Sequence, residues 1–434
     1  MDRSAPGWQP VRDEAVSRLF LFMRNAGRSY AKSRNIDAGW EPSGPHGPVL
    51  RPNVSGLSPW LQRRLVSEEE VLATVTGFHG VDASRKFISE VMWRTYMKGY
   101  MATYPGIWAA YLKERNRQHA RLEHDGHLRR SYKDACDGVT GIECFDHWVR
   151  ELRHTGYLHN HARMWFASIW IFTLRLPWAL GADLFEQHLL DFDVASNTLN
   201  WRWVAGLHTN KRAYAAKASN IAVCTSERFR PSQPLAKDPS PIVEKATFER
   251  LALPRYVEPL DFDDTGVLLT LEDLYIEESP MTELRGVRAV AGGIPREVYA
   301  RGASELRRRF DAGALMDGLQ RAGHHFGCDG HRLPDGEGWL GSTLQWAEDH
   351  GLRRVLIMAP QVGDWESPLA RLMATLQGRG IATDLVQRDW DTELFPHASG
   401  GFSRFRDRAF NLLPRLLSTD NALARHGTPL RLVT

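Results

Sequence analysis

One stretch of the chain, residues 156–206, concentrates amide, carboxylate and indole side chains. It contains, in order, Asn160 between two histidines, Arg163, Met164, Trp178, Asp191, Asp193, Asn197, Trp201 and Trp203. A buried helix requires an apolar face, but it does not require so many polar groups and indoles together. The stretch therefore predicts a site for a large, flat ligand with polar edges.

A second set of side chains with binding chemistry lies on a helix predicted over residues 87–105. Glu90, Trp93 and Arg94 stand at positions i, i+3 and i+4, so they share one face of that helix. These three side chains are compatible with a surface ion pair beside a core tryptophan. They are equally compatible with a pocket that recognises a π-system and an amide.

The segment Ser55–Leu61, with sequence SGLSPWL, predicts the start of a helix. Ser58 is followed by Pro59, a residue whose fixed φ suits the first helical position. The backbone N–H groups at such an end can bind a phosphate. Taken alone, the segment favours a plain capped helix.

The elements that position these residues are helical throughout the first half. Apolar spacing predicts a helix over residues 11–35, a Pro- and Gly-rich loop follows over 35–54, and Ser67 with Glu70 forms a capping box. Residues 106–135 are polar and basic, which indicates a solvated face. Helices recur to about residue 217, so the first half is predicted to be all-α.

A proline-rich stretch separates this half from a part with a different pattern. We predict a helical domain over residues 1–228, a linker over 229–264 and an α/β domain over 265–434. The last part alternates short buried strands, at 266–270, 287–292, 354–360 and 381–387, with helices near 303–322, 341–350 and 367–379. This alternation predicts a parallel sheet covered on both faces.

Composition narrows the classes of protein. Residues 1–254 contain 34 Lys and Arg against 26 Asp and Glu, whereas residues 255–434 contain 21 against 26. The basic half suits a polyanionic partner. Four cysteines without a CxxC pair argue against disulfides, and no signal or membrane-spanning segment is predicted, so we expect a cytoplasmic protein. The loop with His324, His325, Cys328 and His331 lacks a second ligand pair, and no metal site is predicted.

Several spaced motifs resemble the photolyase/cryptochrome family over about residues 20–220. They are SGLSPWL, FISEVMWR (87–94), TGIECFDHWVRELRHTGYLHNHARM (140–164) and LLDFDVASNTLNWRWVAG (189–206). The resemblance implies an all-α FAD-binding photolyase-like domain followed by a Rossmann-like parallel α/β domain. In the family the α/β antenna domain comes first, and residues 390–410 look like its end. We therefore predict a circular permutation.

The resemblance also implies a cofactor, FAD, and the residues that would bind it. These are Tyr30, Ser55, Gly56, Leu57, Ser58, Leu61, Glu90, Arg94, Asn160, Arg163, Asp191, Asp193 and Asn197. Asp191 and Asp193 would lie at the adenosine side and the ribityl region, and Asn197 would face flavin N5. Whether the α/β domain holds an antenna chromophore is left open.

The activity implied by the resemblance is light-driven electron transfer from reduced FAD to a pyrimidine dimer in damaged duplex DNA. Glu90, Trp93, Asn160, Met164 and Trp203 match the family's substrate-contacting residues. Trp201 and Trp178 match the inner and middle members of its electron-transfer chain. Residues 115–135 contain no tryptophan, so either Tyr132, Trp148 or Trp165 completes that chain or photoreduction is impaired.

Two other functions stay open at this point. The missing outer tryptophan and the divergent segment 207–228 favour a cryptochrome-type blue-light sensor that signals through a protein partner. A flavin enzyme that acts in the dark on a small substrate is the third alternative.

Overall fold

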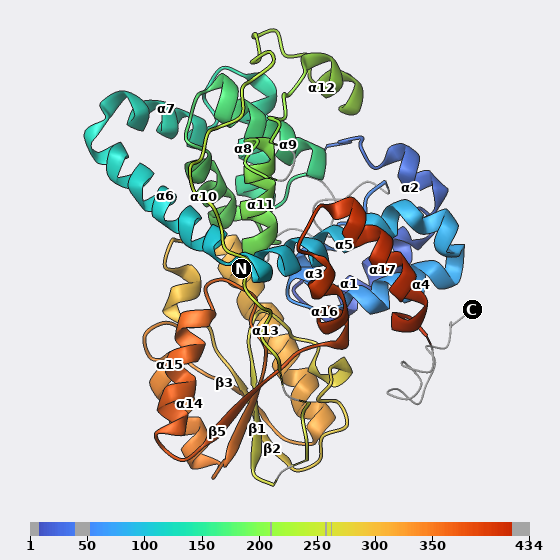
Figure 1. Cartoon of the computed structure of the whole chain (residues 1–434), viewed down its shortest axis with the longest axis vertical. Helices are drawn as coiled ribbons and strands as arrows, with labels where there is room; N and C mark the ends of the chain where they lie inside the picture. Colours follow the sequence, from blue (N-terminus) through green and yellow to red (C-terminus); the bar gives the residue numbers. More distant parts are fainter. Residues whose placement is uncertain (1–7, 40–52, 209–210, 257, 262, 419–434) are drawn as a thin grey trace, which may run out of the picture.

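The computed structural model describes residues 8–39, 53–208, 211–256, 258–261 and 263–418. A helical part forms one end of the molecule, and a part built on a single sheet forms the other (Figure 1). Among the described residues, no helix has both the length and the apolar character to cross a membrane.

The helical part contains twelve α-helices and one π-helical turn in its described residues. They are α1 (Arg12–Met23), α2 (Arg28–Ser33), α3 (Ser58–Gln62), α4 (Glu68–His79), α5 (Val81–Thr103), α6 (Gly106–His124), α7 (Gly126–Asp137), α8 (Glu143–Thr155), α9 (Asn160–Ser168), η1 (Ile169–Thr173), α10 (Trp178–His188), α11 (Val194–Val204) and α12 (Ala218–Cys224). The helix expected over 87–105 is α5, which starts earlier.

The helix expected over residues 11–35 is divided into α1 and α2. His79 Nε2 lies 2.7 Å from the carbonyl oxygen of Met23, the last residue of α1. A Cβ atom at Gly27 would come within 2.7 Å of the His79 ring. The chain therefore turns where a histidine from α4 meets a glycine backbone, and apolar spacing alone does not reveal that contact.

Two other local predictions concern helix starts. Ser67 is confirmed as the N-cap of α4, since Glu70 N–H donates to Ser67 Oγ at 3.1 Å. The Glu70 carboxylate does not complete the predicted box, because it accepts from Arg12 at 2.6 and 2.8 Å. The polar segment 106–135 forms α6 and most of α7, with Asp125 capping α7 through the Leu128 N–H. Its polarity is that of two helices with exposed faces.

The second part is built on five parallel strands in the order β3-β2-β1-β4-β5. They are β1 (Thr265–Leu269), β2 (Val287–Gly292), β3 (Gly330–Arg332), β4 (Arg354–Met358) and β5 (Ala382–Val386). Figure 1 shows α13 (Glu305–Phe326) on one side of the sheet, with α14 (Trp339–Asp349) and α15 (Glu366–Gln377) on the other, as right-handed crossovers require. The predicted fold class is confirmed, and the short edge strand β3 was not expected.

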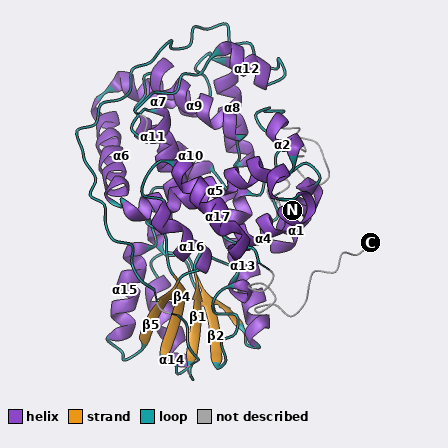
Figure 2. Ribbon diagram, turned by 45° about the vertical axis from the view of Figure 1, so that its right-hand side comes forward, coloured by secondary structure: helices purple, strands orange, loops and turns teal. Residues whose placement is uncertain are grey.

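The proline-rich segment between the two parts contains no helix or strand over its described residues from 226 to 264. It nevertheless packs on the helical part. Arg202 of α11 forms an ion pair with Glu244 at 2.5 Å, and Leu251 N–H donates to the Thr103 carbonyl at 2.9 Å. Figure 2 shows this long loop beside the helices.

After β5 the chain returns to the helical part. The elements α16 (Asp389–Leu394), η4 (Phe395–His397) and α17 (Phe402–Leu416) pack on α5. Trp390 Nε1 donates to Thr95 Oγ1 at 2.9 Å, and both side chains are buried. The last described helix therefore lies against the first half of the chain, although it follows the sheet in sequence (Figure 1).

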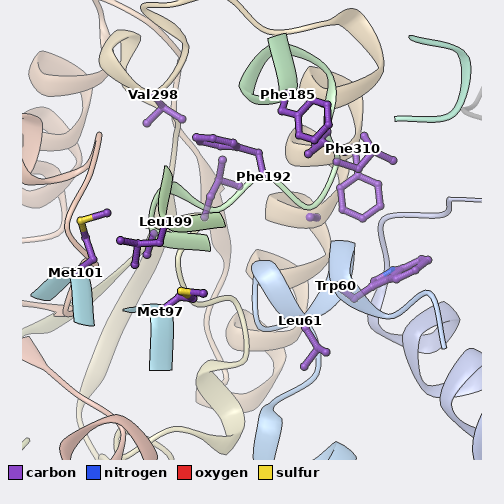
Figure 3. Packing of buried hydrophobic residues seen from close by; sticks show 14 of the residues in the cluster. Trp60, Leu61, Met97, Met101, Phe185, Phe192, Leu199, Val298 and Phe310 are labelled. Atoms are coloured by element: carbon purple, nitrogen blue, oxygen red, sulfur yellow. The ribbon is translucent and has the colours of Figure 1, made fainter. Parts of the chain in front are cut away.

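Buried ion pairs and apolar packing join the two parts. Arg64 donates to Asp391 Oδ1 at 2.7 Å and to Asp273 Oδ2 at 3.3 Å, and all three side chains are buried. Nearby, Trp60 of α3 meets Phe310 of α13 edge to face, with ring centroids 5.8 Å apart. Figure 3 shows these rings with Met97, Met101 and Leu199 in the same core.

Candidate functional site

An inner cluster of polar side chains joins α3, α5, α9, the turn before α11 and α11 itself. We define it as Ser58, Arg94, Arg163, Asp191, Asp193 and Asn197. Ser58 Oγ donates to Asp191 Oδ2 at 2.5 Å, and Arg163 Nη2 donates to the same oxygen at 2.8 Å. The fold thus brings together residues from three of the predicted segments.

The second oxygen of Asp191 distinguishes this cluster from an ordinary ion pair. Asp191 Oδ1 is buried and accepts no hydrogen bond from any described residue. Burial opposes the charge on Arg163, but Asp191 outweighs this effect and raises the pKa of Arg163. A buried carboxylate oxygen without a donor is costly, so the site fits a ligand that supplies an O–H or N–H group.

Asp193 anchors the other end of the inner cluster. Its Oδ1 caps α11 by accepting from Ser196 N–H at 2.6 Å, and its Oδ2 lies 3.6 Å from Lys98 Nζ and 3.9 Å from Arg94 Nη1. Burial favours the neutral acid, but Lys98 and Arg94 hold the pKa of Asp193 below its usual value. Burial and the neighbouring Arg94 lower the pKa of Lys98. These charges are arranged to hold an anionic or strongly polar group.

Asn197 lies one turn into α11 from Asp193. It is buried, and its Nδ2 donates to the Ala182 carbonyl at 2.9 Å. This bond fixes the orientation of the amide. Within the described residues the structure gives its oxygen no hydrogen bond, so the oxygen remains available as an acceptor.

The predicted phosphate turn is present with one difference. Helix α3 has Leu57, not Ser58, as its N-cap, and the Ser58 hydroxyl bonds to Asp191. Gly56 adopts a positive φ of 61°, which a glycine tolerates readily. Leu57 and Leu61 are buried, and Ser55 Oγ accepts only a 3.4 Å bond from Leu57 N–H. The capping role expected for Ser58 is therefore wrong.

Tyr30 lies apart from the inner cluster. Its ring packs edge to face on Phe22 and Phe87, with centroids 5.9 Å and 5.3 Å apart. Burial and the charge of Glu90 raise the pKa of its hydroxyl. Its predicted contact with the cofactor stays a prediction.

An outer group comes from α5, α9 and α11, the helices that also carry Arg94, Arg163 and Asn197. We define it as Glu90, Trp93, Asn160, Met164 and Trp203, none of which is fully buried. Glu90 pairs with Lys86 at 2.8 Å and with Arg34 at 3.2 Å. Trp203 packs on Tyr214 at a centroid distance of 5.5 Å.

Trp93 has an intramolecular partner that sequence spacing does not reveal. Its ring stacks on Phe402 of α17, with centroids 3.6 Å apart and planes inclined by 10°. Phe402 follows Trp93 by more than 300 residues in the chain. Only the return of α17 to α5 brings the two rings together.

The two tryptophans assigned to electron transfer have different neighbours. Trp201 is buried and meets Trp170 at a centroid distance of 6.3 Å, and Trp170 meets Tyr132 at 6.0 Å. Trp178 instead packs on Tyr111 at 5.6 Å. Trp170 lies in the π-helical turn η1, an irregularity that often marks functional sites.

Lys98 and Trp170 are the main residues that the sequence reasoning missed. Lys98 stands four residues after Arg94 on α5, so helical spacing could have identified it. Trp170 could not have been chosen over its neighbours, because its orientation depends on η1. Within the described part of the chain, no group of three or more His, Cys, Asp or Glu side chains could hold a metal ion.

Comparison with known proteins identifies the helical part. Residues 87–235 match the family model described as the FAD-binding domain of DNA photolyase. A deoxyribodipyrimidine photo-lyase from Streptomyces griseus is 35% identical over 159 residues, 36% of this chain and 33% of that protein. A cryptochrome DASH from Idiomarina loihiensis is 30% identical over 168 residues, 36% of this chain and 35% of that protein.

A crystal structure of a bacterial class III photolyase from Agrobacterium tumefaciens is also similar. It is 27% identical, with a TM-score of 0.38, over 48% of this chain and 40% of that one. The chain spans about a third of the length of the curated relatives it matches. The matched residues include α9 to α11 and most of the inner cluster, and over them the chain is similar to proteins of the photolyase/cryptochrome family.

Proposed function

We propose that the protein is a FAD-dependent enzyme that uses light to split pyrimidine dimers in DNA. The observation that carries the proposal is the inner cluster, with its paired Ser58, Arg163 and Asp191 and the unpartnered Asp191 Oδ1. These groups come from separate elements and fit a cofactor with hydroxyl, amide and phosphate groups. The match to a FAD-binding family supports the same cofactor.

Within this proposal each inner residue has a binding role. Asp191 would accept a hydrogen bond from the adenosine side, and Arg163 would neutralise it and offer donors to the diphosphate. Asp193 and Arg94 would hold the ribityl and diphosphate region, and Asn197 would orient its amide oxygen toward flavin N5. When bound and reduced, FAD would supply the electron that light makes available.

Other residues would complete the cofactor site. They are Tyr30, Ser55, Gly56, Leu57, Leu61, Glu90 and Asn160. Gly56 would allow the backbone of the turn to approach a phosphate closely, since glycine has no side chain and tolerates the positive φ found here.

The outer group would bind the substrate. A lesion must leave the base stack to be reached, and an extruded base is held by aromatic walls and hydrogen bonds. Trp93 and Trp203 would provide the walls, and Glu90 would accept hydrogen bonds from the dimer. Asn160 and Met164 would complete the cavity. The incomplete burial of all five side chains supports this assignment.

In photoreduction, electrons would reach the flavin from outside along Tyr132, Trp170 and Trp201. The successive centroid distances of 6.0 Å and 6.3 Å support this route. Tyr132 is half-buried on α7, so the route would end near the surface. Trp178, the middle member implied by the resemblance, packs on Tyr111 instead and would lie on a side branch.

Partner and location are part of the proposal. The basic first half would bind DNA phosphates with an affinity that falls as salt rises. All four cysteines are free, which supports a cytoplasmic location. We also propose that the chain divides into a helical domain (1–228), a linker (229–264) and an α/β domain (265–434) that is permuted to follow the helices. No antenna chromophore is proposed.

A repair assay tests the function. Reduced, FAD-loaded protein is illuminated with blue light in the presence of an oligonucleotide that contains one thymine dimer. We expect loss of the dimer in the light and none in darkness. A Glu90→Gln variant, which keeps the shape of the side chain, should repair more slowly. If the illuminated wild-type protein leaves the dimer intact, the proposed activity is wrong.

A further inference from the structure

The first residue of α17 covers one face of Trp93. The rings of Trp93 and Phe402 are nearly parallel at a centroid distance of 3.6 Å, so they overlap almost completely. Tyr96 meets both rings edge to face at 5.5 Å. A planar ligand can stack on that face of Trp93 only if Phe402 leaves it.

The rest of α17 is held firmly. Phe405, Ala409 and Leu413 are buried on one face of the helix. The loop before the helix is also tied to α5, since the hydroxyl of Tyr96 donates to the Gly400 carbonyl at 2.7 Å and that of Tyr104 donates to the Ser399 carbonyl at 3.1 Å. Displacement of the whole helix would break all of these contacts.

The first turn of α17 is the part that can move alone. Its N-cap is Gly401, which provides no side-chain cap. Gly401 is exposed and Gly400 is half-buried, and two consecutive glycines allow backbone rotation at low steric cost. Phe402 can therefore swing away while Phe405 stays in the core.

Glu90, one turn earlier on α5, is likewise engaged by side chains of the protein itself. Its carboxylate is paired with Lys86 and Arg34. The two outer residues with the strongest predicted contacts to a substrate are thus both engaged by the protein's own side chains.

We propose that Phe402 competes with an extruded pyrimidine for the face of Trp93 and so opposes entry of a base into the site. This inference rests on the proposed function. Displacing Phe402 costs the same free energy for an intact base and for a dimer, whereas unpairing costs less for a dimer. Phe402 therefore raises the threshold for entry of both, and the dimer, whose total cost is lower, enters more readily.

The test measures binding of a single-stranded oligonucleotide containing one thymine dimer to the full-length, FAD-loaded protein in the dark. Phe402→Leu keeps an apolar side chain of similar volume but removes the ring. Since aromatic stacking adds roughly a factor of three to ten to an equilibrium, we expect about three- to tenfold tighter dimer binding than in wild type. The same oligonucleotide without a dimer should gain affinity by a similar factor, because the cost of displacing Phe402 is common to both ligands.

Phe410→Leu is the matched control. Phe410 lies on the same helix, is also half-buried, and packs against Arg85 rather than Trp93. Its affinity for the dimer should stay within about twofold of wild type. Thermal unfolding of both variants shows whether each is folded. If Phe402→Leu proves unfolded, Phe402→Met replaces it, because an unbranched side chain of similar volume adapts to the same gap.

The outcomes separate this inference from the proposed function. If wild type and Phe402→Leu bind the dimer equally, the competition is wrong and the function stands. Equal gains in the Phe402 and Phe410 variants would show general loosening of α17 and would also overturn the competition. If none of the proteins binds the dimer, both the competition and the repair function are wrong.

Discussion

The inner cluster and the outer group draw residues from the same helices, α5, α9 and α11, yet their side chains find partners differently. Asp191 keeps a buried oxygen without a donor among the described residues. Glu90 and Trp93, in contrast, have protein partners in Lys86 and Phe402. Under the proposed function, this difference fits a site preorganised for a permanent cofactor and closed toward a transient substrate.

The largest expected effect concerns the ion pairs on which both regions rest. Arg64 is buried with Glu68, Asp273 and Asp391, and Glu68 also accepts from Arg94 at 2.9 Å. Arg64→Ala would leave three buried carboxylates without this cation. We expect a loss of about 3–5 kcal/mol of unfolding free energy, measured by urea denaturation.

The exposed pair Arg296–Glu337 provides the control for this prediction. Both side chains are largely exposed, so Arg296→Ala should change the unfolding free energy by less than about 1 kcal/mol. Equal effects of the two variants would mean that the buried ion pairs do not carry the junction of the two parts.

The next largest effect concerns Asp191, whose second carboxylate oxygen has no donor among the described residues. Asp191→Ala removes the acceptor of Ser58 and Arg163 and leaves Arg163 without its ion-pair partner. We expect FAD to bind about a hundredfold more weakly, since stranding a partly buried charge costs roughly 3 kcal/mol. A flavin fluorescence titration measures this change. The FAD affinity of Asp191→Asn should fall between those of wild type and Asp191→Ala. Unchanged affinity would exclude Asp191 from the cofactor site.

The two candidate middle members of the electron-transfer route, Trp170 and Trp178, have different neighbours. Trp170 links Trp201 to Tyr132, whereas Trp178 packs on Tyr111. Trp170→Phe should slow photoreduction of the bound flavin more than Trp178→Phe does, because indole is the better electron donor at a linking position. Transient absorption measures the rates. The reverse order would restore Trp178 as the middle member.

Acid should weaken the inner cluster through Asp193. Burial favours protonated Asp193, but Lys98 and Arg94 lower its pKa in the folded protein. A carboxyl group with a lowered folded pKa stabilises the protein above the unfolded pKa, near 3.9, and this contribution is lost as pH falls through the folded pKa. Asp193→Asn should therefore reduce the slope of stability against pH in this acid range. An unchanged slope would contradict the assignment.

The smallest expected effect concerns Glu90, whose carboxylate is paired with Lys86 and Arg34. Arg34→Ala frees one side of Glu90, and the pair it breaks is partly exposed at 21% and 23%. Such a pair contributes about 0.2–1 kcal/mol, so thermal stability should hardly change. Dimer binding should tighten by about twofold, as Glu90 becomes easier to engage. A large loss of binding would mean that Arg34 itself contacts the substrate.

The sequence predicted much of the inner cluster because its residues lie in short, regular motifs. Asp191, Asp193 and Asn197 are close in sequence and lie at or near the start of one helix, so their proximity follows from local structure. The alternation of buried strands and helices likewise predicted the parallel sheet. The hydrogen bond from Ser58 to Asp191 is a tertiary contact, so the sequence predicted a local capping role for Ser58 instead.

The remaining features depend on long-range packing. The stacking of Phe402 on Trp93 requires the chain to return after the last strand, and no local pattern encodes that approach. The contact between Trp201 and Trp170 depends on a π-helical turn that shifts the side chain by part of a turn. Both misses lie where packing, rather than propensity, orients an aromatic ring.

The central claim is that the helical part of this chain holds FAD. The most direct measurement is the absorption spectrum of the purified protein in the dark, recorded before and after the protein is stripped of ligand and mixed with FAD. We expect flavin bands at the outset or on reconstitution, with much weaker retention in Asp191→Ala. A wild-type protein that shows no flavin bands and takes up no added FAD would contradict the account.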